Sequence, residues 1–184
     1  MKLKKILIAA FACSIVSQAA FAAGQTTIEI FGMQAQGATR EKLRAAINKT
    51  RMVRIIELNR NFLQDFYDPS QLLHGAKELR IAYTGKGIFG YAEYSYPNPL
   101  PFTIKNTFEA LTEKYGDPYS HTGNKAIWSF PQGMSITLTR YTSDEPKLVL
   151  EIMDDNNRYK VVEDTGKLRM ENEKKINAIK NSAF

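Results

Sequence analysis

The chain has 184 residues, with 25 Lys and Arg against 19 Asp and Glu and a single cysteine, Cys13. This length suits one domain, or two small fused modules, with a packed core. One cysteine excludes a disulfide framework and a cysteine metal site, and no stretch interleaves basic with aromatic residues in the way that nucleic-acid grooves do.

The first 22 residues have the pattern of a secretory signal peptide. Three lysines precede the apolar run ILIAAFACSIV, and AFA at residues 20–22 is a small-residue cleavage site. The apolar run is shorter than the roughly 20 residues that a membrane-spanning helix needs. We therefore predict cleavage near Ala22 and a periplasmic or secreted protein without a transmembrane segment. The formal net charge of +6 then falls to about +3, because three lysines are removed.

We expect a first helix-and-strand module over residues 26–97. TTIEIFGM alternates as a strand does, and Thr39 can cap a helix over REKLRAAINKT in which Leu43 and Ile47 fall at helical spacing. Residues 51–78 indicate no single structure, because MVRIIEL suits a strand and FLQDFYDPSQLL could hold a helical turn. ELRIAYT and IFGYAEYSYP, separated by GKG, predict a hairpin.

A second module is expected over residues 101–153. FTIKNTFEALTEKYG carries one apolar helical stripe, formed by Ile104, Phe108, Leu111 and Tyr115. Gly116 and Pro118 should end this helix. KAIWSF, MSITLTRY and KLVLEIMD then predict an antiparallel meander, with Trp128 anchored in the core. Residues 158–184 are charged and predict a solvated helix or tail.

These elements predict an α+β fold in which an antiparallel sheet packs one face against helices. The domain should span residues 23–157. A helix, a turn, a strand, a glycine turn and a further strand follow in the same order in both halves of the chain. This order indicates a possible tandem repeat of residues 26–97 and 101–153.

The run from KYGDP through the strand that carries Trp128 to the strand SITLTR resembles a known family. A helix, G-x-P, a strand and a strand follow in this order in small periplasmic modules typified by β-lactamase inhibitor protein and by the small lipoprotein of the outer-membrane barrel-assembly machinery. The resemblance covers residues 102–153, with a weaker echo at 39–96, and it implies an architecture. It transfers no binding residue, because the inhibitor's cysteine pairs and a convincing lipid-attachment cysteine are missing.

Candidate catalytic and metal-binding residues are few. His121 lies near Asp117, but Gly116 places both in a loop, and His74 has no spacing to His121 that suits a metal. MDDNNRY lacks the ligand spacing of a calcium loop, and no serine-nucleophile signature is present. Carboxylates near a turn, such as Asp65 with Asp68, are usually capping or solvated groups. We expect no catalytic residue, no metal and no cofactor.

Aromatic residues are the remaining signal, because both faces of the strand IFGYAEYSYP carry them. We predict an exposed patch on the open face of the sheet that would bind a protein partner, formed by Phe89, Tyr91, Tyr141 and Lys147. The alternative is that one aromatic set is core and the other lies beneath a loop or the C-terminal tail.

The predicted function is non-catalytic binding of a protein partner in the cell envelope, as an inhibitor, an adaptor or an assembly accessory. One alternative is a hydrolase that uses His121 with nearby carboxylates. Another is a carrier of a small ligand or lipid, which would need a pocket between the sheet and the helices. The basic stretch TREKLRAAINKTRMVR could in addition contact anionic lipids, although such a run is usually the solvated side of a helix.

Overall fold

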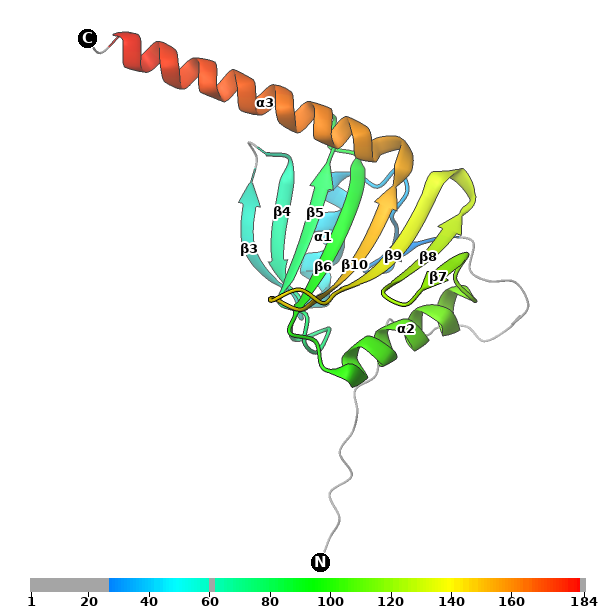
Figure 1. The fold of residues 1–184 in the computed structure, drawn as a ribbon. Helices are drawn as coiled ribbons and strands as arrows, with labels where there is room; N and C mark the ends of the chain where they lie inside the picture. Colours follow the sequence, from blue (N-terminus) through cyan, green and yellow to red (C-terminus); the bar gives the residue numbers. More distant parts are fainter. Residues whose placement is uncertain (1–26, 60–61, 183–184) are drawn as a thin grey trace, which may run out of the picture.

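The computed structural model describes residues 27–59 and 62–182, and it shows an α+β protein (Figure 1). The predicted signal peptide, residues 1–22, lies outside the described residues. The described residues begin with a small hairpin of β1 (Glu29–Ile30) and β2 (Met33–Gln34), where we predicted one strand. Every other strand of the described residues belongs to one antiparallel sheet, which confirms the predicted fold class.

The two halves of the chain repeat one order of elements, a helix followed by four strands. The first half contains α1 (Arg40–Thr50), β3 (Arg54–Asn59), β4 (Gln64–Asp68), β5 (Glu78–Tyr83) and β6 (Phe89–Pro97). The second half contains α2 (Pro101–Tyr115), β7 (Ser120–Thr122), β8 (Lys125–Phe130), β9 (Met134–Tyr141) and β10 (Lys147–Asp154). The segment 51–78, for which the sequence indicated no single structure, thus forms a hairpin of β3 and β4 and a turn.

The halves join through their last strands. The sheet order is β3-β4-β5-β6-β10-β9-β8-β7, with β6 and β10 antiparallel at its centre. The register runs from Pro97 opposite Lys147 to Tyr91 opposite Met153. The outer strands are therefore the first strand of each half, β3 and β7.

One face of the sheet, here called the core face, packs against α1 and α2. Leu43 and Ile47 of α1 are fully buried, and Thr39 Oγ1 caps the helix by accepting from the Lys42 amide at 3.4 Å, which confirms the predicted first helix. Further core side chains come from both halves of the sheet: Leu79, Ile81, Tyr94, Leu150, Ile152, Ile136 and Trp128. A single core therefore runs through both halves.

The C-terminal end of α2 is held by Trp128. Its indole Nε1 donates to the Gly116 carbonyl at 2.8 Å, and the Gly116 amide donates to the Thr112 carbonyl at 2.8 Å. Gly116 has φ 82° and ψ −171°, a region of backbone space that essentially only glycine adopts. The predicted helix end is confirmed, although this ψ differs from that of a left-handed helical residue.

The last helix, α3 (Asp155–Ser182), starts against the opposite face of the sheet. Asp154 Oδ1 caps it by accepting from the amides of Asn156 at 3.0 Å and Asn157 at 3.2 Å. Val161 packs over Gly90 of β6 and is the only buried side chain among those described in α3. Figure 1 shows α1 behind the sheet and α3 running along the upper end of the strands.

A β-bulge changes which side chains of β6 face the core. Ala82 pairs with Tyr91, whereas the next residue, Tyr83, pairs with Phe89, so Gly90 is an extra residue in β6. Phe89 therefore turns to the core face, where it is fully buried. The prediction that Phe89 shares an exposed face with Tyr91 is wrong, because it assumed unbroken alternation along the strand.

Among the described residues, no helix combines the length and the apolar character needed to cross a membrane.

Candidate functional site

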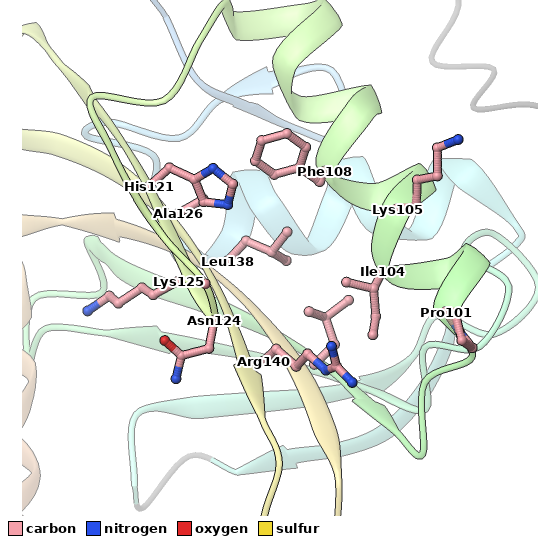
Figure 2. Close-up of a pocket in the computed structure, with 12 residues that line it drawn as sticks. Pro101, Ile104, Lys105, Phe108, His121, Asn124, Lys125, Ala126, Leu138 and Arg140 are labelled. Carbon is pink, nitrogen blue, oxygen red and sulfur yellow. The ribbon is translucent and has the colours of Figure 1, made fainter.

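A groove lies between α2 and the strands β7–β10, with a volume of about 370 Å³. Figure 2 shows its walls, with α2 on one side and the curved edge of the sheet on the other. Its lining residues are Pro101, Ile104, Lys105, Phe108, His121, Gly123, Asn124, Lys125, Ala126, Leu138, Arg140 and Leu148. The volume is at the lower end of the range for small-molecule sites, about 300–1,000 Å³.

The floor and the roof of the groove are apolar. Ala126, Leu138 and Leu148 form the floor and are buried in the sheet, whereas Ile104 and Phe108 of α2 face them and are half-buried. Ile104 and Phe108 belong to the predicted apolar stripe of α2. In the structure this stripe packs against the core, but only Leu111 is buried.

The hollow arises from residue size along β8. Ala126 and Trp128 share the core face and pair with Leu138 and Ile136 of β9. Trp128 fills the space beneath α2 and contacts Phe108, with ring centroids 5.8 Å apart, but Ala126 has only a methyl group to offer. The groove therefore opens at Ala126, next to the large side chain of Trp128.

The mouth of the groove is cationic. Arg140 and Lys125 make no ion pair within residues 27–59 and 62–182, and Lys105 makes an exposed one with Glu109 at 3.6 Å. In Figure 2, Arg140 lies at the end near Pro101 and Lys105 extends outward from α2, whereas Lys125 extends from β8 on the side away from the groove. No lining residue is acidic. The arrangement thus combines an apolar channel with positive charge at its entrance.

His121 lines the far end of the groove and lies in β7, paired with Ala126, so its predicted place in a loop is wrong. Its ring stacks on Phe108, with centroids 4.9 Å apart and an interplanar angle of 28°. The groove lining brings no carboxylate beside His121, so it offers no partner for the acid–base pair with Asp117 that the sequence suggested. In the described part of the chain, no three His, Cys, Asp or Glu side chains gather closely enough to hold a metal ion.

The residues of the predicted aromatic patch do not meet. Tyr141 is 43% exposed and lies beneath the Lys147 ammonium, which is 4.9 Å from the ring centroid. Tyr91 is half-buried and pairs with Met153, six residues along β10 from Lys147, which pairs with Tyr141. Six residues of strand span about 20 Å. Tyr91 and Tyr141 therefore belong to separate surfaces.

The edge strand β3 carries an apolar surface that the sequence analysis did not single out. Ile55, Ile56 and Leu58 are 43%, 54% and 39% exposed. β3 pairs with β4 alone, so its other side has no partner strand among the described residues. β3 has a bulge at Ile56, because Ile55 pairs with Tyr67 and Glu57 with Phe66. Edge strands are usually protected by charge, proline or bulges, but the three aliphatic side chains of β3 stay exposed. The sequence MVRIIEL suits a strand but does not show that this strand lies at an edge of the sheet.

A buried charge cluster joins α1 to β4. Asp65 has no solvent exposure, and its carboxylate accepts from Arg40 at 2.7 Å and from Arg44 at 2.6 Å. Beside it, the hydroxyls of Tyr67 and Tyr83 are buried and make no hydrogen bond to the described residues. Burial raises the pKa of both tyrosines. Arg40 and Arg44 belong to α1 and Asp65 to β4, so we assign the cluster to the attachment of α1.

Comparison with protein-family models, with curated proteins and with solved structures finds no match to this chain. The resemblance of residues 102–153 to the inhibitor-like periplasmic modules therefore stays a prediction. The groove and the edge strand are the two features on which a functional argument can be built.

Proposed function

We propose that this protein is an exported, non-catalytic protein of the cell envelope that binds a protein partner at the edge of β3. Export to the periplasm is supported by the signal-peptide pattern of residues 1–22. The observation that carries partner binding is the apolar, exposed and unpaired edge of β3.

Strand addition is the form of binding that suits this edge. An extended peptide segment can continue the sheet, because the main chain of β3 has unused donors and acceptors on its outer side. Ile55, Ile56 and Leu58 would then lose their contact with water, which adds a hydrophobic contribution to the main-chain hydrogen bonds. Arg51 and Lys49, which precede the strand and are exposed, favour a segment with acidic residues.

Photo-crosslinking in the producing cells tests this proposal. A photoreactive residue in place of Ile56 should give an adduct of one defined mass, whereas the same residue in place of Val162 on α3, which is more exposed than Ile56, should not. The adduct should fall at least tenfold when Glu57→Pro is added, because proline cannot donate a main-chain hydrogen bond and is disfavoured within a pairing strand.

The same photoreactive residue in place of Tyr141 tests the alternative interface. An adduct at Tyr141 and none at Ile56 would place the interface at the surface that the sequence analysis predicted and would overturn the assignment to β3. Adducts at neither position would contradict partner binding by both surfaces.

A further inference from the structure

The two helix–sheet contacts differ, although both halves repeat the same elements. In the first half, α1 buries Leu43 and Ile47 completely and is tied down by the ion pairs of Asp65. In the second half, α2 buries only Leu111, at its C-terminal end. Ile104 and Phe108, nearer the N-terminal end of α2, pack against the core but stay half-buried, because the groove lies beneath them. A side chain larger than that of Ala126 would fill the groove. The open groove therefore points to a bound ligand.

The shape of the groove suits a single hydrocarbon chain. Its volume is about 370 Å³, and one water molecule in the liquid takes about 30 Å³. A methylene group is of similar size, so the groove holds about a dozen of them. Ile104, Phe108, Leu138 and Leu148 provide aliphatic and aromatic walls on both sides.

The charge of the groove is unequal along its length. On β9 the core face runs from Ile136 through Leu138 to Arg140, so an apolar row ends in a guanidinium. Figure 2 shows Arg140 at the Pro101 end of the groove and the stacked Phe108 and His121 at the other end. The first turn of α2, which starts at Pro101, contains no acidic residue, and the N-terminal end of a helix carries a partial positive charge.

We propose that this groove binds a single-chain anionic amphiphile, with the anionic head at Arg140 and the acyl chain between α2 and β8–β10. A free fatty acid of about ten carbons and a lysophospholipid of similar chain length share this chemistry. The cationic mouth excludes a positively charged amphiphile. The site lies away from β3, so it is independent of the proposed partner-binding edge.

Calorimetric titration with a series of carboxylates tests the apolar part of the site. Hexanoate, octanoate, decanoate and dodecanoate, used below their micelle-forming concentrations, should bind with affinities that rise by about fourfold for each added methylene. The rise should stop when the groove is full. Affinity that does not depend on chain length would overturn the proposal, as would the absence of saturable binding.

Charge is tested with matched ligands and variants. Arg140→Gln should weaken decanoate binding at least tenfold and leave decanol binding unchanged, because Arg140 is exposed and contributes only to the head group. Arg169→Gln, an exposed arginine on α3, is the control and should bind decanoate as the unchanged protein does. Decyltrimethylammonium should not compete. Equal binding of this cation, or an unchanged decanoate affinity in Arg140→Gln, would refute an anion-selective site.

The position of the acyl chain is tested with variants whose larger side chains fill the groove. Ala126→Leu should weaken decanoate and decanol together, because the larger side chain occupies the floor. Ile104→Trp is a second filling variant, at a half-buried position on the side of α2 that faces the groove. If both fold and neither weakens binding, the ligand lies elsewhere and the proposal fails.

The source of the ligand is decided by comparing dodecanoate with a twelve-carbon lysophosphatidic acid. The site is supported if either ligand binds and if Arg140→Gln weakens that binding. The ligand with the higher affinity identifies the head group. Ile56→Lys, which blunts the β3 edge, should leave both affinities unchanged. Failure of partner crosslinking at Ile56 and failure of amphiphile binding are therefore separate results.

Discussion

Asp65 is the residue on which the attachment of α1 depends. Burial by itself raises the pKa of this carboxyl, but hydrogen bonds from Arg44 and Arg40 and their positive charges outweigh the effect of burial, so the pKa is lowered from its ordinary 3.8. The sequence analysis placed Asp65 with Asp68 among capping or solvated carboxylates. That interpretation fails for Asp65, because its arginine partners are 21 and 25 residues away, on a helix that sequence spacing cannot relate to β4.

Asp65→Asn should destabilise the protein by about 3 kcal/mol at pH 7, because Arg40 and Arg44 then lose their carboxylate partner within a buried site. Urea denaturation measures this loss. Asp68→Asn is the matched control and should change stability little, since Asp68 pairs with Arg54, whose side chain is 80% exposed. A loss of less than 1 kcal/mol in Asp65→Asn would show that the cluster does not stabilise the fold.

The way in which the free energy of unfolding changes with pH should also depend on the Asp65 carboxyl. Because the pKa of Asp65 is lower in the folded state, its contribution is fully present above the ordinary pKa of 3.8 and is lost as the pH falls through the folded-state pKa. Asp65→Asn should therefore lose less stability than the unchanged protein when the pH is lowered from 4 to 2. Parallel curves for the two proteins would contradict the lowered pKa.

At the level of elements, the contact between α3 and β6 depends on Gly90. A Cβ atom at this position would overlap Val161 Cγ2. The alternating pattern of IFGYAEYSYP predicted β6 itself, but it could not show the bulge that places Gly90 beneath a helix 70 residues later. Alternation gives the faces of a regular strand, whereas a bulge depends on pairing with the neighbouring strand.

Gly90→Ala should push the first turns of α3 away from the sheet, at a cost of about 1–3 kcal/mol. Hydrogen exchange should become faster in residues 158–168. Adding Val161→Ala should restore slow exchange in part, because it removes the overlapping methyl groups. Unchanged exchange in Gly90→Ala would mean that α3 does not rest on β6 in solution.

For the molecule as a whole, the duplicated order of helix and strands was largely visible in the sequence. The periodic segments from residue 78 to residue 154 have the predicted types, because each combines a strong pattern with a clear turn. The groove was not visible, because Ile104 and Phe108 carry the same helical spacing whether or not the sheet beneath them is fully packed. The arrangement of β3 was equally hidden, since an apolar strand is normally expected inside the sheet.

One core that runs through both halves should make unfolding cooperative. Trp128 is the only tryptophan and lies in the second half, so its fluorescence reports that half, while far-UV circular dichroism reports both. The two urea transitions should coincide. Asp65→Asn, which lies in the first half, should shift both midpoints equally. If the urea midpoint of the Trp128 fluorescence does not change in Asp65→Asn, the two halves unfold separately.

The pairing of β6 with β10 also determines when the sheet can be completed. Pro97 and Lys147 are 50 positions apart in the sequence, and Tyr91 and Met153 are 62 positions apart. As the chain emerges from its N-terminal end, β6 remains an open edge until almost all of the second half has followed. Contacts this distant in sequence form slowly. The newly emerged first half therefore passes through a period in which β6 is accessible to a chaperone or to another chain.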